Sequence, residues 1–137
     1  MYSKIMVPVD LAHTDKIAKA LDTAADLARH YGIPICYVGV TASAPDAVAH
    51  TPEEYGEKLA AFARSKAGAG GFEVTTRVFL SHDPTRDLYK ILTDAADEIG
   101  ADLVVMASHV PGLPEHLFTS NAGYVASHSD MSVFVVR

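Results

Sequence analysis

Polar residues with the chemistry to hold a ligand follow two of the apolar segments of the chain. Asp10 comes directly after the first segment, and Ser108 and His109 come directly after a later one. Ser120 and Asn121 stand where a helix is expected to begin. Hydroxyl and imidazole groups, together with the free N–H groups of a helix start, are suited to binding an anionic group, and a carboxylate is suited to accepting hydrogen bonds from the polar part of the same ligand.

Five short segments rich in Val and Ile predict the strands that would position these residues. Three of them are continuously apolar, as is typical of parallel strands covered on both faces. Glu73–Leu80 alternates between apolar and polar residues and therefore predicts an edge strand. The five segments are Lys4–Val9, Ile33–Val40, Glu73–Leu80, Asp102–Ala107 and Ser132–Val136.

Segments with a helical period separate the strands. Thr14 is the expected N-cap of the first helix, and Gly32 and Gly100 are the expected stops of the first and third. Pro84 suits the first position of the third helix. The predicted helices are Asp15–Tyr31, Pro52–Ala67, Pro84–Ile99 and a shorter one from near Ser120 through Val125 toward His128.

This alternation predicts one α/β domain over residues 1–137, with a five-stranded parallel sheet and helices on both faces. The usual strand order for such a sheet is 3-2-1-4-5. Ligands bind such sheets beyond the carboxyl ends of the strands, where the order reverses. We therefore expect a crevice between the first and fourth strands, beside Asp10 and Ser108.

Three motifs carry a resemblance to a known family. The segments "KIMVPVD", "GADLVVMASH" and "SVFVVR", in this order and spacing, resemble the universal stress protein family, and "ASHVP" with "SNA" resembles its branch with "ASHRP" and "GSNA". The resemblance implies a Rossmann-like fold of the adenine nucleotide alpha hydrolase type. It also implies a cytosolic, homo-oligomeric stress-response regulator, with ATP or AMP as ligand and magnesium where the ligand is ATP.

Family members that bind ATP carry a loop of the form G-x2-G-x9-G-[ST]. Strict spacing places its glycines on Ala107, Val110 and Ser120, whereas a loop shorter by one residue places the last glycine on Thr119 and the hydroxyl on Ser120. We prefer the shorter register because it preserves "SNA". The ligand-binding residues implied by the resemblance are Asp10, Val40, Ala107, Ser108, His109, Thr119, Ser120 and Asn121.

The loop departs from the family pattern where a phosphate cradle needs glycine. Val110 is β-branched and disfavours positive φ, and Pro111 has no N–H to donate. The sequence thus predicts a degenerate nucleotide site that binds weakly. The alternative is an interaction protein without a nucleotide, whose crevice is closed by its own loop Val110–Phe118.

Other interpretations of the polar residues stay open. Asp10 could serve only as a turn or cap contact, and Ser120 with Asn121 only as an N-cap. A metal site formed with Asp10 lacks the ligand spacing that would make it specific; its other candidates are His13, His82, His109 and His116. No nucleophile beside a base and no Walker lysine is evident, so we expect no activity beyond slow ATP hydrolysis.

Composition and charge limit the partners. The net charge is −6 with only 11 scattered Lys and Arg residues, which argues against a nucleic-acid partner. No apolar run approaches a membrane span, and no leader is evident. The single cysteine, Cys36, is expected to be a buried residue of the core. A chain with one cysteine forms no internal disulfide, which fits a reducing compartment, the cytoplasm.

Self-association is expected at the last strand. Ser132–Val136 is apolar and stands at the sheet edge in the expected order. An uncovered edge offers unpaired N–H and C=O groups for pairing. We therefore expect a homodimer through this strand, alongside a regulatory partner that the sequence does not identify.

Overall fold

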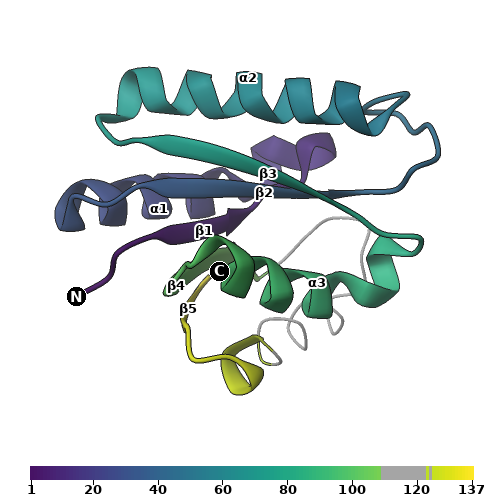
Figure 1. Ribbon diagram of the computed structural model, residues 1–137. Helices are drawn as coiled ribbons and strands as arrows, with labels where there is room; N and C mark the ends of the chain where they lie inside the picture. The colour runs from purple at the N-terminus through teal and green to yellow at the C-terminus, as the bar shows by residue number, and fades with distance from the viewer. Residues whose placement is uncertain (109–122, 124) are drawn as a thin grey trace.

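A parallel sheet lies between two layers of helices in the computed structural model (Figure 1). The structure describes residues 1–108, 123 and 125–137, with residues 69 and 84–87 described by their backbone alone. The helices are η1 (Leu11–Ile17, a 3₁₀ helix), α1 (Ala18–Tyr31), α2 (Pro52–Gly70) and α3 (Pro84–Ile99). The strands are β1 (Ile5–Pro8), β2 (Ile35–Thr41), β3 (Val74–Leu80), β4 (Leu103–Ala107) and β5 (Ser132–Val136).

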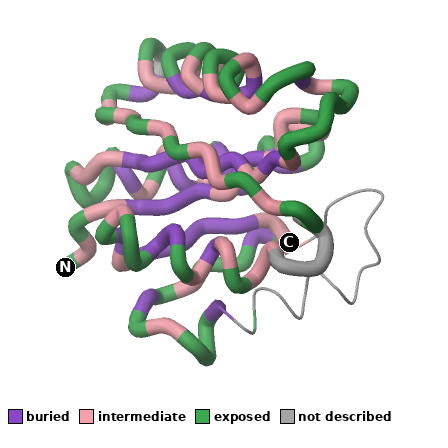
Figure 2. The backbone as a smooth tube through the Cα atoms, turned by 45° about the vertical axis from the view of Figure 1, so that its right-hand side comes forward, coloured by how far each residue is buried: buried purple, intermediate pink, exposed green. Residues whose placement is uncertain are grey.

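The sheet has the predicted order, β3-β2-β1-β4-β5, and every neighbouring pair of strands is parallel. β1 is the central strand, with Ile5 paired to Ile35 on one side and to Leu103 on the other. Ile5, Met6 and Val7 are fully buried, because helices cover both faces of the sheet (Figure 2). This confirms that the continuously apolar segments are interior parallel strands.

Each face of the sheet has its own apolar core. One core joins α1 and α2 to the sheet through residues such as Leu21, Ala24 and Leu59. The other joins α3 to the opposite face through Leu92 and Ala95. Figure 1 shows this arrangement, with α2 above the sheet and α3 below it.

The helices α1 and α3 end at the glycines that the sequence predicts. Gly32, directly after α1, has φ 67° and its N–H bonds the carbonyl of Ala28. Gly100, directly after α3, has φ 73°. Only glycine adopts this left-handed conformation without steric cost, so both stops are confirmed. Residues 125–128 are helical, which matches the end of the last predicted helix, and its start lies outside the described residues.

The first helix does not begin where the sequence predicts. Thr14 is not its N-cap, because a 3₁₀ turn starts at Leu11 and α1 follows from Ala18. The side chain of Asp10 caps that turn instead, accepting from the N–H of Ala12. A carboxylate at the end of β1 offers an acceptor before Thr14 is reached, so the chain turns earlier.

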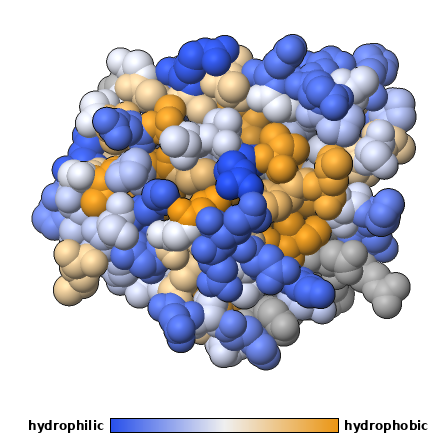
Figure 3. All heavy atoms as spheres, in the orientation of Figure 1, coloured by the Kyte–Doolittle hydropathy of each residue, from blue (hydrophilic) through white to orange (hydrophobic). Residues whose placement is uncertain are grey.

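The edge strand β3 carries a charged side chain across its surface. Arg77 pairs with Glu98 of α3, with 2.5 Å between Nη2 and Oε1, and its guanidinium lies 5.4 Å from the ring centre of Phe79. Apolar residues come to the surface between α2 and α3 in Figure 3. Leu80, at the end of β3, is 58% exposed. The charged side chain of Arg77 on the edge strand β3 discourages pairing of this edge with another strand.

Cys36 lies in β2 as a buried residue, as expected. Burial raises the pKa of its thiol, with a smaller opposing contribution from the side chain of Thr75. A thiol held in its protonated form is a poor nucleophile. Cys36 is therefore a packing residue of the apolar core.

Asp102 fastens the amino-terminal edge of the sheet. Its carboxylate accepts from the N–H of Ser3 at 2.9 and 3.0 Å, from the hydroxyl of Ser3 at 3.0 Å and from the N–H of Lys4 at 3.1 Å. Burial alone would raise the pKa of this carboxyl, but the hydrogen bonds from Lys4 and Ser3 outweigh it and hold the pKa below its ordinary value.

We predict that Asp102→Asn lowers the free energy of unfolding by about 1 kcal/mol at pH 7, because a neutral amide accepts these hydrogen bonds less well. The stability from a carboxyl with a lowered pKa is complete above its unfolded value of about 3.9. It is lost as the pH falls through the folded value. Urea unfolding between pH 3 and pH 7 should show the wild-type advantage shrinking toward the acid end. Asp22→Asn, an exposed position on α1, is the matched control.

Candidate functional site

The candidate site lies where the strand order reverses, between β1 and β4. Asp10 stands two residues beyond the end of β1, and Ser108 directly follows β4, which pairs with β1 in parallel. The carboxyl ends of parallel strands meet at one edge of a sheet, so these two residues share that edge. Val40 lies near the end of β2 and Ala107 at the end of β4. The other predicted ligand residues, His109, Thr119, Ser120 and Asn121, lie outside the described residues.

Asp10 is already hydrogen-bonded through both carboxylate oxygens. Oδ1 accepts from the N–H of Ala12 at 3.0 Å, and Oδ2 lies 2.8 Å from Nδ1 of His13. The side chains of Asp10 and His13 are 36% and 42% exposed, so the pair faces solvent in part. The predicted cap role of Asp10 is confirmed.

His13, which the sequence left among weak metal candidates, is the imidazole that Asp10 holds. Its backbone, at φ −139° and ψ 45°, interrupts the 3₁₀ turn, and its N–H bonds the carbonyl of Asp10 at 3.0 Å. This conformation brings the ring back to the carboxylate. No cluster of three or more His, Cys, Asp or Glu residues able to hold a metal occurs among the described residues.

Ser108 has a backbone N–H that is not available to a ligand. That group bonds the carbonyl of Val136 in β5 at 2.8 Å. A phosphate at this strand end would therefore meet the Ser108 side chain and not its backbone donor. Pro111 has no N–H, so the sequence after β4 also lacks one backbone donor.

Val40 is half-buried and packs with Phe79 and Leu88 against the core on the α3 face of the sheet. It thus lies in the strand next to β1, near the edge that carries Asp10. An apolar side chain at this place is compatible with the predicted contact to a base. Its role in binding stays a prediction.

Tyr55 of α2, a residue that the sequence analysis did not place at the site, packs over the carboxyl-terminal part of β2. It is 5% exposed, and its ring lies directly over Gly39 of β2. Burial raises the pKa of Tyr55 to about 12, and the charges of Asp10 and Asp46 add to the shift. The hydroxyl thus lies within the electrostatic reach of the Asp10 carboxylate. The signal in the sequence was the glycine inside an apolar strand, which marks a close approach.

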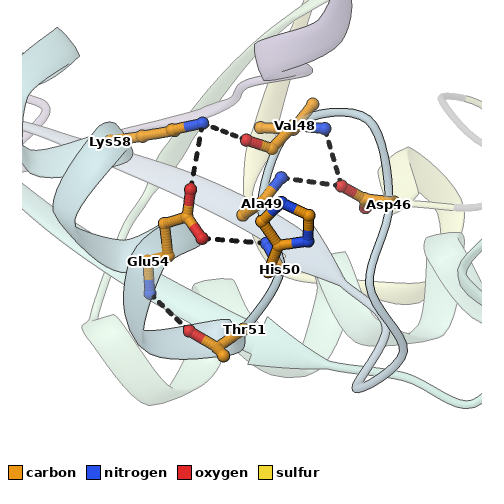
Figure 4. Close-up of polar contacts among 7 residues, drawn as sticks. All are labelled: Asp46, Val48, Ala49, His50, Thr51, Glu54 and Lys58. Atoms are coloured by element: carbon orange, nitrogen blue, oxygen red, sulfur yellow. Dashed lines mark hydrogen bonds and ion pairs between the residues drawn. The ribbon is translucent and has the colours of Figure 1, made fainter.

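The loop between β2 and α2 is fixed by its own side chains (Figure 4). The carboxylate of Asp46 accepts from the N–H groups of Val48 and Ala49 at 2.8 and 2.9 Å. These hydrogen bonds, that of Ala49 first, lower the pKa of Asp46. Lys58 of α2 donates to the carbonyl of Val48. The loop therefore forms a fixed wall beside Tyr55.

The start of α2 completes this wall. Thr51 caps the helix by accepting from the N–H of Glu54 at 3.1 Å, and Glu54 accepts from the N–H of His50 at 2.9 Å. The ammonium Nζ of Lys58 lies 3.4 Å from the carboxylate Oε1 of Glu54. A capped first turn with reciprocal hydrogen bonds sets the direction in which the helix leaves the loop. That direction places Tyr55 over Gly39.

The fold agrees with the comparisons to known proteins. The model of the universal stress protein family matches residues 1–137. The chain belongs to the universal stress protein family. Universal stress protein G of Salmonella typhimurium is 29% identical over 142 residues, with all of both chains covered.

Solved structures of universal stress proteins share the fold. One in complex with cAMP has a TM-score of 0.70 at 21% identity, with 99% of this chain and 97% of that chain covered. Another, from Archaeoglobus fulgidus in complex with dAMP, has a TM-score of 0.67 at 24% identity, with 99% and 98% covered. Among the described residues of the present chain, no helix is long and apolar enough to cross a membrane.

We predict that Gly39→Ala lowers the free energy of unfolding by about 2 kcal/mol, because the new Cβ would overpack the site. It would lie 2.5 Å from Cε1 and 2.9 Å from the hydroxyl oxygen of Tyr55. Adding Tyr55→Leu should make the double variant less destabilised than the sum of the two single changes, as urea unfolding would measure.

Gly68→Ala is the control for this prediction. Gly68 lies in α2, and a Cβ there would meet nothing within 4 Å. The change should leave the protein as stable or more stable, since alanine favours a helix. Additive costs for Gly39→Ala and Tyr55→Leu would contradict the contact.

Proposed function

We propose that this universal stress protein is a homo-oligomeric, cytoplasmic stress-response regulator that binds an adenine nucleotide weakly at the edge between β1 and β4. The observation that carries the proposal is the Asp10 carboxylate, held at the end of β1 with Val40 in the adjacent strand β2. Relatives of the same fold are recorded with cAMP and dAMP. ATP or AMP is the proposed ligand, with magnesium where it is ATP.

The nucleotide would be held from both sides. Asp10 and Val40 would contact the base and ribose, while Ala107, Ser108, His109, Thr119, Ser120 and Asn121 would contact the phosphates. "ASHVP" and "SNA" also favour the family branch with "ASHRP" and "GSNA". Binding would change which partners the oligomer engages. Catalysis is not part of this proposal.

The second candidate is an interaction protein without a nucleotide. It is favoured by the Ser108 N–H, which is engaged by Val136, and by Val110 and Pro111, which replace flexible donors. In this case the segment Val110–Phe118 would close the crevice. Mass spectrometry of natively purified protein, denatured before measurement, separates the two candidates by showing whether AMP, ADP or ATP is released.

Calorimetric titration with AMP, and with ATP and magnesium, tests the first candidate directly. We expect binding in the high micromolar to millimolar range, and Ser120→Ala should weaken ATP binding by about threefold to tenfold because it removes one hydroxyl contact to a phosphate. Ser65→Ala, at an exposed position of α2, is the control and should leave the affinity unchanged. The absence of heat at millimolar nucleotide would reject the proposal, and an unchanged affinity in Ser120→Ala would reject the shorter loop register.

Self-association is proposed to use the free edge of β5. Among the strands of the described residues, β5 pairs with β4 alone, and its adjacent residues Phe134 and Val135 are 46% and 40% exposed. Consecutive residues of a strand point to opposite faces, so the edge presents an apolar side chain on each face. Two copies related by a twofold axis could pair these edges and bury all four side chains.

We predict that Val135→Lys shifts the protein from dimer to monomer, because the edge would then bring two ammonium groups together. Sedimentation velocity measures the change. Leu80→Lys is the matched control, since Leu80 is 58% exposed on the opposite edge strand, β3. A dimer that survives Val135→Lys, or that is lost equally in Leu80→Lys, would argue against the β5 interface.

A further inference from the structure

Tyr2 and Tyr31 lie ring against ring at the amino-terminal edge of the sheet, opposite the edge that carries Asp10. Tyr2 stands shortly before β1, and Tyr31 is the last residue of α1. Their ring centroids are 5.4 Å apart and the ring planes cross at 82°, so the edge of one ring points at the other. Edge-to-face contacts of this kind are favourable between aromatic side chains. The fold thus brings together two phenols that are far apart in the sequence.

The pair can be reached from solvent. Tyr31 is 37% exposed and Tyr2 is half-buried. The hydroxyl of Tyr2 donates to the hydroxyl of Ser132 at 2.9 Å, in a hydrogen bond that is itself exposed. The exposed ring of His30 lies next to Tyr31, with 4.9 Å between the ring centroids. A small molecule dissolved in water can therefore approach both phenols.

Two other tyrosines of the chain are protected from such a molecule. Tyr37 is fully buried and Tyr55 is 5% exposed. Burial raises the pKa of each to about 12, with the charges of nearby carboxylates adding to the shift at Tyr55. A phenol loses an electron readily only when its proton can leave at the same time, and a buried phenol has no water to take the proton. The ring of Tyr37 also contacts Phe62 and not a second tyrosine.

We propose that Tyr2 and Tyr31 form a site of oxidative modification, at which a small one-electron oxidant joins the two rings as dityrosine. The carbonate radical represents the class of oxidant. The two residues lie at the edge of the sheet away from the candidate nucleotide site, so this inference does not depend on the proposed function.

The reaction balances with two equivalents of the oxidant. Each phenol gives one electron to a carbonate radical, which is reduced, and gives its hydroxyl proton to water or to the carbonate that forms. The two tyrosyl radicals then couple, and a bond forms between the ring carbons next to the oxygens. Each ring finally moves the proton of that carbon to its own oxygen, which restores both phenols. The protein has lost two hydrogen atoms in total.

The fold holds the two rings within reach of each other. The N–H of Ser3 bonds the carboxylate of Asp102, which fixes the backbone directly after Tyr2, while Tyr31 is carried by the helix α1. Exposed side chains change rotamer within nanoseconds, so the edges of the two rings can meet. Two reactive groups held side by side couple far faster than the same groups free in solution. Coupling within one chain is therefore favoured over coupling between chains.

The test exposes the full chain in dilute solution to the ruthenium(III) tris-bipyridine complex, a one-electron oxidant generated by light. We expect the blue fluorescence of dityrosine in protein of monomer size on a denaturing gel, with the mass lowered by two hydrogen atoms. Trypsin should then release residues 1–4 joined to residues 30–58. The linked protein should melt at a higher temperature, because a link between residues 2 and 31 restricts the unfolded chain.

Tyr2→Phe and Tyr31→Phe keep an aromatic ring at each position and should each abolish the joined peptide. Tyr89→Phe, at a half-buried position of α3, is the matched control and should leave its yield unchanged. Urea should lower the yield in wild type, because the two rings meet only in the folded chain. N-acetyltyrosine, oxidised in parallel, shows that the oxidant is active.

Three results would overturn the inference. The first is wild-type protein without the joined peptide while N-acetyltyrosine is coupled. The second is a joined peptide that persists in Tyr31→Phe, which would place the link on another tyrosine of residues 30–58. The third is a link found only in protein of dimer size on the denaturing gel, which would show coupling between two copies and not within the pair.

Discussion

The whole candidate site depends on where β1 ends. β1 lies between β2 and β4, fully buried through Ile5, Met6 and Val7, so neither its position nor its direction can change without breaking both cores. Its carboxyl end therefore delivers Asp10 to one fixed place. The amino-terminal edge is held by a second carboxylate, Asp102, which bonds the chain just before β1. A strand fastened at its start and packed along its length can present a side chain at its end with little freedom.

Asp10 has a structural and a proposed functional task that use the same atoms. As a cap it satisfies the Ala12 N–H and orients His13, and as a ligand residue it would accept from a sugar hydroxyl. The two tasks are compatible because a carboxylate has more lone pairs than the turn requires.

The sequence predicted most of the fold because its strongest signals are local. Buried strands are recognisable from continuous Val and Ile, and Gly32 and Gly100 mark helix ends by a conformation that other residues avoid. The early turn at Leu11 was not predicted, since Thr14 is also a suitable cap and only three-dimensional placement decides which acceptor is reached first. The packing of Tyr55 on Gly39 was missed for a related reason. It joins α2 to β2 across the loop after Thr41, and no short-range period reports such a contact.

The charges at this edge bear on whether the phosphates or the sugar of the proposed nucleotide would face Asp10. The protein carries a net charge of −6, and the charges of both Asp10 and Asp46 add to the raised pKa of Tyr55, so a phosphate placed close to these carboxylates would be repelled. Hydroxyl groups and the exocyclic amine of a base are donors and would be attracted instead. On this argument, the phosphates of the proposed ligand would extend away from Asp10, toward β4. At the end of β4 the N–H of Ser108 bonds the carbonyl of Val136, so a phosphate there would need other donors. For the proposed ligand, each added phosphate brings negative charge that would need N–H or hydroxyl donors at the end of β4 or beyond it.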